Sequence, residues 1–319
     1  MLANSNRAVS ERRTRRSKGR KVTGIILLDK PVGSTSNKAL QQVKHLFHAQ
    51  KAGHTGSLDP IATGLLPICM GEATKISQFL LDADKTYLAT LKLGEKTNTG
   101  DAEGEIVQTR HVDCNISEQI ERVLRQYAGS IEQIPPMHSA IKKNGVPLYK
   151  LAHQGIEIER EPRTVMIFDL QLVSFQGDEL QIRVHCSKGT YIRTLADDIG
   201  EDLGCGAHIS QLRREQVGPF GAQMMHTMDD LQRLAEQGFG ALDEVLLPID
   251  QGLMQWPAVK LSGDAGFYIQ QGQPVFVPKV ADRGYVRLYL NDHEFLGVGE
   301  ILDDGRVAPK RLMKNTKIG

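Results

Sequence analysis

The sequence predicts an α+β fold, built on a mixed, largely antiparallel sheet flanked by helices and followed by a small β-rich module. Segments with strand periodicity and segments with helix periodicity intermingle along the chain without the strict alternation of a βαβ fold. Strand-like segments also follow one another as in hairpins, which favours antiparallel pairing. At 319 residues the chain is long enough for about two domains.

The first elements are read from short apolar runs. Residues 25–28 are an apolar strand that ends at Asp29 and Pro31. A helix follows, because residues 34–36 offer caps and the next apolar residues recur at helical spacing. After a Gly-rich loop at 53–64 we expect a second helix, with Ile76, Phe79 and Leu80 on one face, and then an alternating strand at 85–93.

The second half of this domain contains an expected insertion. Residues 134–155 are rich in proline, glycine and basic side chains, which is typical of a surface insertion and not of a core element. Two alternating segments follow, and the second ends at 180–186 with its apolar residues on one face. Residues 190–203 form a helix with an apolar stripe, and Gly204 ends it.

The character of the chain changes after Pro248. Trp256 and Pro257 open a segment of short strands, in which Val286 and Leu288 begin an alternation and Gly297 and Gly299 are expected to break the next strand. We therefore expect a basic arm at 1–21, a first domain at 22–250 with the insertion inside it, and a separate β-barrel-like module at 256–315.

Charge is informative only locally, because the 39 Lys and Arg residues nearly balance the 38 Asp and Glu residues. The exception is the arm, where Glu11 alone opposes the basic residues. Such a segment is expected to be disordered, and it is either a solubilising tail or a phosphate binder, with nucleic acid favoured. Its basic residues are Arg7, Arg12, Arg13, Arg15, Arg16, Lys18, Arg20 and Lys21.

Several protein classes are disfavoured. No apolar segment follows the arm as in a signal peptide, and no run approaches the roughly 20 apolar residues of a membrane span, so we expect a cytoplasmic protein. Phosphate-binding glycine motifs are missing apart from a lone GxG at 204–206, so we expect no nucleotide cofactor. The four cysteines form no CxxC pair, and we expect free thiols and no metal site. They are Cys69, Cys114, Cys186 and Cys205, and the nearest approach to a metal pair is Cys205 with His208, which lacks two further clustered ligands.

The segment GHTGSLDPIATG, at 53–64, places one carboxylate, Asp59, among glycines and prolines. One reading is structural, because Asp-Pro is a common turn and Asp caps helices. The other is functional, because glycines allow close ligand approach and the apolar run behind the loop anchors it, which would hold a reactive group rigidly. The residues alone leave both readings open.

Four long segments resemble one family, in its order. GHTGSLDPIATGLLPICMGEATK, IILLDKPVGSTSN, DKTYLATLKLG and CSKGTYIRTLADDIG are similar to the signatures of bacterial tRNA pseudouridine-55 synthases of the TruB type, and the segment from Pro257 resembles a PUA module. The resemblance covers about residues 22–315. It implies an enzyme that flips uridine 55 out of the tRNA T-loop and isomerises it to pseudouridine without metal or cofactor, expected to act as a monomer.

The resemblance also implies roles for single residues. Asp59 matches the essential aspartate, and Arg193 matches an arginine that pairs with it and would lower its pKa by about 1 to 3 units. His54 would insert where the flipped base had been, and Tyr87 would stack on that base and assist proton transfer. The residues that would line the pocket are Tyr191 and Leu212.

Each of these residues also has a structural reading. His54 in a Gly-rich loop is ordinarily solvated, whereas Tyr87, Tyr191 and Leu212 could simply be core residues. Arg193 could form a helix pair with Asp197. The lysines of the insertion, which matches the family's thumb, are either phosphate contacts or solvated surface residues. They are Lys142, Lys143 and Lys150, while Lys30 and Pro31 match a motif that supports the loop.

Two rival functions remain. The chain could be a non-catalytic RNA-binding protein that helps tRNA to fold, but Asp59 would bring nothing to a surface that binds phosphates. It could also be an aspartate-dependent hydrolase of a nucleoside or sugar, but the basic arm, the thumb and the PUA-like module favour a polymer substrate.

Overall fold

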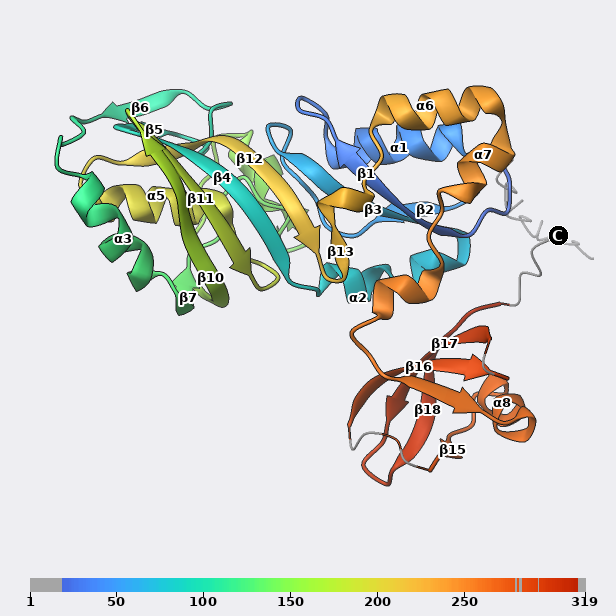
Figure 1. The fold of residues 1–319 in the computed structure, drawn as a ribbon. Coiled ribbons are helices and arrows are strands. Elements are labelled where there is room, and N and C mark those ends of the chain that lie inside the picture. The colour runs from blue at the N-terminus through green and yellow to red at the C-terminus, as the bar shows by residue number, and fades with distance from the viewer. Residues whose placement is uncertain (1–18, 279, 281–282, 292, 315–319) are drawn as a thin grey trace, which may run out of the picture.

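A nine-stranded sheet forms the larger part of the molecule in the computed structural model, which describes residues 19–278, 280, 283–291 and 293–314 (Figure 1). Its strands are β1 (Gly24–Lys30), β2 (Ala52–His54), β3 (Thr63–Met70), β4 (Lys85–Leu93), β7 (Gly129–Gln133), β10 (Arg163–Gln176), β11 (Glu179–Cys186), β12 (Ala207–Val217) and β13 (Phe220–Gly221). The order is β1-β3-β12-β4-β11-β10-β7, with β2 beside β3 and β13 beside β12.

The sheet is antiparallel except where β3 meets β12. These two strands are parallel, with Arg213 opposite Thr63 and Arg214 opposite Gly64. The predicted α+β class with a mixed, largely antiparallel sheet is therefore confirmed. The parallel pairing also positions the site, because it places the start of β3, which follows the Asp59 loop directly, beside the middle of β12.

Helices cover the two ends of the sheet in separate groups (Figure 1). Helices α3 (Ser117–Gln126) and α5 (Ile192–Asp202) pack on β4, β10, β11 and β12, and α1 (Ser36–Leu46), α6 (Met228–Gln237) and α7 (Phe239–Glu244) pack on β1 and β3. The 3-10 turns are η1 (Gly71–Lys75), η2 (Ala222–Met224) and η3 (Ile249–Leu253). No helix in the described part of the chain is long and apolar enough to cross a membrane.

Local chemistry explains where the main helices begin and end. The Thr35 side chain accepts a hydrogen bond from the Lys38 N–H at the start of α1, as expected for a helix cap. Helix α5 ends just before Gly204, whose φ of +80° is the left-handed conformation that favours glycine at this position. Both helices lie where the apolar spacing predicts them.

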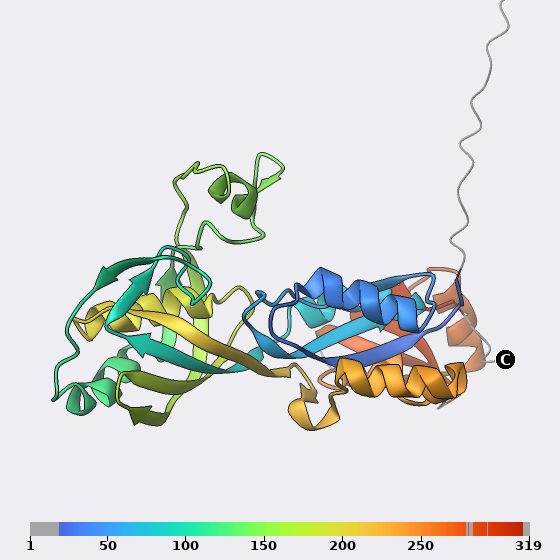
Figure 2. The ribbon, with the colours of Figure 1, turned by 90° about the horizontal axis from the view of Figure 1, so that it is seen from above.

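Other elements differ from the prediction. The helix expected around Ile76 is a 3-10 turn, η1, followed by the five-residue α2 (Ser77–Leu81). The apolar run at 65–68 is part of β3, a buried strand, and β12 has no counterpart in the prediction. The insertion at 134–155 contains a hairpin of β8 (Lys142–Lys143) and β9 (Val146–Pro147) and a short helix, α4 (Leu148–Ala152). It projects from the body of the molecule (Figure 2), and we call it the thumb.

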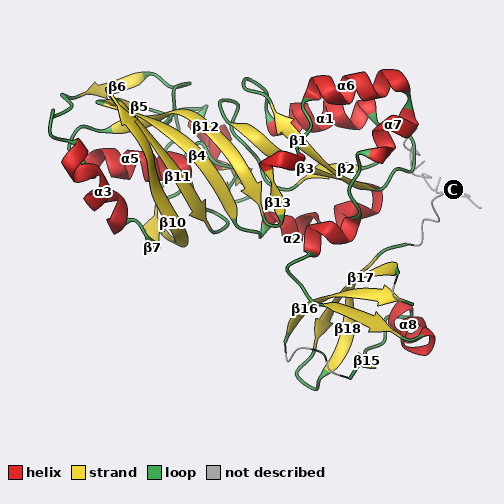
Figure 3. Cartoon of the chain, in the orientation of Figure 1, coloured by secondary structure: helices red, strands yellow, loops and turns green. Residues whose placement is uncertain are grey.

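The remaining sheets are small. A hairpin of β5 (Glu95–Thr97) and β6 (Ile106–Thr109) lies beside the main sheet. The C-terminal module has a curled five-stranded sheet and α8 (Gly263–Gln270) (Figure 3). Its strand order is β14-β16-β17-β18-β15, with β14 (Ala258–Leu261), β15 (Val275–Phe276), β16 (Gly284–Leu290), β17 (Glu294–Ile301) and β18 (Arg306–Leu312).

The expectation that Gly297 and Gly299 break their strand is wrong. Strand β17 runs through both residues, with an irregular register beside them. A Cβ atom at Gly297 would lie 2.1 Å from the Arg311 carbonyl oxygen, so glycine is needed there for the close approach of β18.

The module packs closely on the first domain. The ring of Phe79 on α2 lies 4.9 Å from that of Trp256 and 5.3 Å from that of Tyr285. Lys75 also donates a 2.7 Å hydrogen bond to the Leu312 carbonyl. The module and the first domain therefore share a hydrophobic cluster.

Candidate active site at Asp59

Asp59 lies in the loop between β2 and β3, and α1 holds this loop from one side. The Leu58 N–H donates to the Ser36 hydroxyl at 2.7 Å, and that hydroxyl donates to the Leu58 carbonyl at 3.1 Å. On the other flank of Asp59, the Gly33 N–H donates to the Pro60 carbonyl at 2.8 Å. The residues before and after Asp59 are thus both fixed to the start of α1.

Lys30 supports the same loop through hydrogen bonds from its buried side chain. Its side chain is fully buried, and Nζ donates to the carbonyls of Ser34 at 2.6 Å, Pro31 at 2.9 Å and Pro60 at 3.3 Å. Burial lowers its pKa to about 8, although the charge of Asp59 acts in the opposite direction. The structure therefore shows Lys30 supporting the loop.

Arg193, on α5, connects Asp59 to two other segments, the turn at 99–101 and the base of the thumb. The guanidinium, whose residue is 7% exposed, places Nε 3.0 Å from Asp59 Oδ2 and Nη1 3.4 Å from Asp101 Oδ2. Nη1 donates to the Thr99 carbonyl at 3.0 Å, and Nη2 donates to the His138 carbonyl, at the base of the thumb, at 2.8 Å. All these bonds fix the arginine beside the carboxylate.

The alternative reading of Arg193 as a helix pair with Asp197 does not fit this geometry. Asp197 is bound by Lys96 instead, with Nζ 2.8 Å from Oδ1. Asp59 also does not cap a helix. Its backbone carbonyl accepts a bond from the Ala62 N–H at 3.1 Å, so the loop makes a turn while the side chain faces Arg193.

Arg193 does act to lower the pKa of Asp59, as expected, but the pKa as a whole lies above its ordinary value. Burial raises the pKa of Asp59 above its ordinary value, and the charge of Arg193 offsets this only in part, because Asp101 repels a second negative charge. The side chain itself is 40% exposed. The carboxylate is thus open to a ligand on one side and partly desolvated on the other.

Tyr87 and Leu212 come from neighbouring strands. Tyr87 on β4 lies opposite Arg214 on β12, and Leu212 lies opposite Ala89, two residues further along the same pair of strands. Tyr87 packs at the margin of the core cluster that contains Leu212. Burial raises the pKa of the Tyr87 hydroxyl, a hydrogen bond from Arg214 lowers it, and the negative charge of Asp59 adds to the rise. This half-buried position of Tyr87 is compatible both with a structural role in the core and with a role in lining a pocket.

Tyr191 immediately precedes α5 and therefore lies beside Arg193. Its N–H donates to the Gln133 side chain at 3.0 Å, and its carbonyl accepts a bond from the same amide at 3.3 Å. Burial is the main cause that raises its pKa, and Asp59 contributes. The structure thus pairs Asp59 with Arg193 and brings Tyr87 and Tyr191 close enough for the charge of Asp59 to act on both hydroxyls.

His54 lies at the end of β2, opposite Ile68, and the charge of Arg214 acts on it as on Tyr87. Its ring is half-buried, so it is not the freely solvated residue of the alternative reading. Nδ1 is buried without a hydrogen-bond partner among the described residues, and burial lowers the pKa of the ring. The histidine is therefore neutral near pH 7, with one unused polar atom.

Comparison with known proteins places this geometry in a family. The model of the TruB family pseudouridylate synthase N-terminal domain matches residues 44–192, and models of tRNA pseudouridylate synthase B and TruB C-terminal domains match residues 193–254 and 257–313. A curated tRNA pseudouridine synthase B from Pseudomonas fluorescens is 54% identical over 93% of this chain and 97% of its own length. The chain belongs to the TruB family. A second relative of the same name, from Aeromonas salmonicida, is also 54% identical over 95% of this chain and 97% of its own length.

Solved structures show the same fold beyond the TruB relatives. A chain of a Cbf5-Nop10-Gar1 complex superposes with a TM-score of 0.72 at 26% identity, covering 91% of this TruB-family chain and 84% of its own. A chain of an H/ACA RNP bound to a substrate RNA has a TM-score of 0.71 at 24% identity, over 92% of this chain and 86% of its own. These likenesses support the pseudouridine synthase fold.

The thumb lysines of the TruB-family chain lie away from Asp59. Lys142 and Lys143 form β8, Lys150 is on α4, and all three are exposed. Among their side chains, only Lys143 has a hydrogen bond within the described residues, 3.1 Å to the Glu159 carbonyl. The base of the thumb, however, reaches the site through His138.

Two residues of the site were not found from the sequence. Arg214 is 1% exposed, and its guanidinium donates to the carbonyls of Leu65 at 2.7 Å, Gly56 at 3.2 Å and Ser57 at 3.4 Å. Asp101 is 3% exposed and faces Arg193. The resemblance covers both positions. However, nothing in the neighbouring sequence indicates that Arg214, a polar residue in a strand, or Asp101, a single acid in a turn, is buried.

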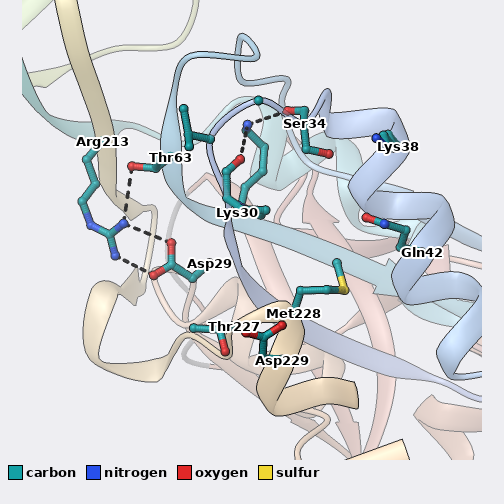
Figure 4. Close-up of a pocket in the computed structure, with 13 residues that line it drawn as sticks. Asp29, Lys30, Ser34, Lys38, Gln42, Thr63, Arg213, Thr227, Met228 and Asp229 are labelled. Carbon is teal, nitrogen blue, oxygen red and sulfur yellow. Dashed lines mark hydrogen bonds and ion pairs between the residues drawn. The ribbon is translucent and has the colours of Figure 1, made fainter. Parts of the chain in front are cut away.

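A cavity of about 540 Å³ is lined by Lys30, Thr63 and Arg213 among other residues (Figure 4). Arg213 there makes a two-bond pair with Asp29, at 3.0 and 2.7 Å. A second cavity of about 510 Å³ lies between the thumb and α5 and includes Arg193 and His138.

Cysteines and acids form no metal centre in the described residues, where no group of three or more His, Cys, Asp or Glu side chains is placed to hold an ion. The four cysteines are free, and Cys114 is exposed whereas the other three are buried. His208 is bound to the Glu95 carbonyl through Nδ1 at 3.0 Å, which explains its burial structurally.

Proposed function

We propose that this protein is a tRNA pseudouridine synthase that acts on the uridine at position 55 of the T-loop, with Asp59 as the catalytic carboxylate. The observation that carries the proposal is the Asp59–Arg193 pair. One carboxylate stays open to a ligand while its loop is fixed on both flanks. The curated relatives, with 54% identity over nearly their whole length, supply the reaction and the RNA class.

The reaction exchanges one glycosidic bond for another. The N1–C1′ bond of the uridine breaks, the uracil turns, and a C5–C1′ bond forms, while C5 gives up a proton and N1 gains one. A rigid carboxylate beside the ribose can act as nucleophile, as base or as a negative charge that stabilises the separated sugar. The proposed chemistry uses no metal and no cofactor.

The target base has to leave the T-loop before the carboxylate can reach it, at a cost of a few kcal/mol for unstacking. Tyr87 and Tyr191, beside Asp59, offer aromatic faces for the flipped base, and Leu212 offers an apolar wall. His54, with its unused Nδ1, would occupy the gap that the base leaves. The Tyr87 hydroxyl, which Arg214 contacts, would also assist proton transfer at C5.

Affinity for tRNA would come from surfaces outside the pocket. Lys142, Lys143 and Lys150 on the thumb would contact T-arm phosphates, which position the RNA without reading its sequence. The C-terminal module, at about 256–315, would bind RNA as a PUA-like domain beside the catalytic domain at 22–250. We propose that the protein acts as a monomer in the cytoplasm.

Product analysis separates this proposal from its rivals. Unmodified tRNA is incubated with the protein and digested, and position 55 is examined for pseudouridine. Our proposal predicts stoichiometric pseudouridine at that position and no free uracil. Bound but unchanged tRNA would indicate a binding protein, and released uracil would indicate a hydrolase.

A further inference from the structure

The outer face of α1 carries basic side chains that lack acidic partners. Between Arg12 and Leu58 the sequence contains a single acidic residue, Asp29. Within the described residues, the lysines on and just after α1 form no ion pair, whereas lysines elsewhere commonly do, as in Lys92–Asp178 at 2.5 Å and Lys310–Glu300 at 2.6 Å. We call this face the α1 basic surface, and it consists of Lys38, Gln41, Lys44, His45, His48 and Lys51.

The surface is hollowed at the end of α1. A cavity of about 300 Å³ is lined by Gln41, Lys44, His45, His48 and Ala49, so nearly every side chain around it carries a hydrogen-bond donor. The backbone carbonyls of Val43, Lys44 and His45 already accept bonds from the N–H groups of residues 47–49. A cavity of this chemistry fits an anionic oxygen group.

His48 is held in an unusual backbone conformation. Its φ of +47° lies in the left-handed region, at the position after a helix where glycine is normally preferred. The chain therefore accepts local strain to keep an imidazole at the rim of this cavity, and such strain often marks a functional position.

Two further contacts join this surface to the rest of the molecule. At its far end, residues 19 and 20 are bound to it, with the Arg20 N–H donating to the His48 carbonyl at 2.6 Å and the Gln50 side chain donating to the Gly19 carbonyl at 2.7 Å. At its near end, Ser36 holds the Asp59 loop. Helix α1 and the thumb lie on the same side of the molecule (Figure 2).

We propose that the α1 basic surface is a second phosphate-binding surface for the RNA substrate, separate from the thumb. This inference rests on the proposed function for the identity of the RNA. The unpaired lysines would contact backbone phosphates along the helix, a length of about 16 Å, and the cavity at Lys44 and His48 would receive one phosphate group.

The first test removes three charges from the full-length protein. The variant K38Q/K44Q/K51Q is compared with R122Q/R125Q/R233Q, which removes three charges from the exposed faces of α3 and α6. We expect the affinity of the first variant for tRNA to fall at least about tenfold at low salt, and its salt slope to fall by about 2 to 3, with the control unchanged. The single-turnover rate at saturating enzyme should be that of the wild type. Wild-type affinity and slope in the first variant would overturn the inference.

A second test uses His48→Gly, which removes the imidazole and relieves the backbone. We expect weaker tRNA binding with an unfolding temperature that is equal to or above that of the wild type. A variant that is more stable and binds normally would overturn a role for the cavity. Pseudouridine formation by the wild type is measured in parallel: its absence would refute the proposed function, whereas normal formation with no effect of either variant would refute only this inference.

Discussion

Arg193 is the side chain on which the electrostatics of Asp59 depend. Its charge is the main cause that opposes the rise in the pKa of Asp59, while burial and Asp101 act in the other direction. If the ionised carboxylate is the active form, the rate of the chemical step increases as pH rises through this pKa. The acid side of the pH–rate profile therefore reports the balance between these groups.

Replacing Arg193 with glutamine should move that acid limb to higher pH. The loss of the cation favours the protonated carboxyl, so we expect a shift of about 1 unit or more and a slower single-turnover rate at pH 6 than at pH 8. The measurement is the single-turnover rate between pH 5 and 9. Arg183→Gln is the control, since Arg183 pairs with Glu215 away from Asp59, at 2.9 Å. An unmoved acid limb in the Arg193 variant would contradict the assignment of that limb to Asp59.

Single residues of this site could be predicted only in part. The resemblance brought together Asp59, Arg193 and Tyr87, and in the structure Arg193 contacts Asp59, whose charge also acts on Tyr87. The resemblance could not predict the direction in which the pKa of Asp59 shifts, because that pKa depends on burial and on Asp101, which is distant in sequence. Arg214 was missed for the same reason.

At the scale of elements, α1 is the support of the catalytic loop. Ser36→Ala removes both hydrogen bonds to Leu58 and leaves a buried N–H without a partner, which costs about 1 to 3 kcal/mol of folding stability. We expect a lower kcat and an unchanged Kd for tRNA, because the loop loses its position but not its charge. Asn37→Ala, on the exposed face of the same helix, serves as the control for both the unfolding temperature and the kinetics. Equal loss of binding and rate would show that Ser36 acts through the fold as a whole.

We expect the charges of the thumb to contribute to tRNA affinity and not to the rate of the chemical step. The variant K142Q/K143Q/K150Q removes three exposed lysines, and we expect weaker tRNA binding with a salt slope lower by about 2 to 3 and a near-normal rate at saturating enzyme. The measurement is binding over a range of salt concentrations, combined with single-turnover kinetics. A slope equal to that of the wild type would mean that these lysines are ordinary solvated residues.

Periodicity predicted some elements and missed others for a physical reason. Strand β4 has alternating apolar residues and helix α5 has an apolar stripe, and both elements lie where the sequence predicts them. Strand β12 has register irregularities at Ile209–Gln211 and Arg214–Gln216, so its alternation is interrupted twice. It also buries an arginine, so hydropathy could not reveal the strand that forms one wall of the site.

At the scale of the whole molecule, we expect the C-terminal module to contribute to stability as well as to the proposed RNA binding. Ending the chain after Gln255 removes Trp256 and Tyr285 from the cluster around Phe79. We expect a lower unfolding temperature, by about 2 to 4 °C for each kcal/mol lost, together with weaker tRNA binding. Below that temperature, the single-turnover rate at saturating enzyme should be nearly intact. A collapsed rate in the folded, truncated protein would show that the module helps to assemble the active site.

The basic arm requires a separate test, because residues 1–18 lie outside the described part of the chain. A deletion of residues 1–18 keeps Arg20, whose guanidinium is 2.5 Å from Asp243. We expect reduced affinity and a smaller salt slope, with unchanged chemistry. Unchanged affinity over a range of salt concentrations would make the arm dispensable.

The central claim is that the Asp59 carboxylate performs the isomerisation, and Asp59→Asn tests it most directly. The amide keeps the size of the side chain and removes its charge. The measurement is tritium release from tRNA carrying 5-tritiated uridine, in a single turnover with enzyme at a concentration that saturates binding. We predict tRNA affinity close to that of the wild type and no release above background, whereas substantial release by the variant would contradict the central role of Asp59.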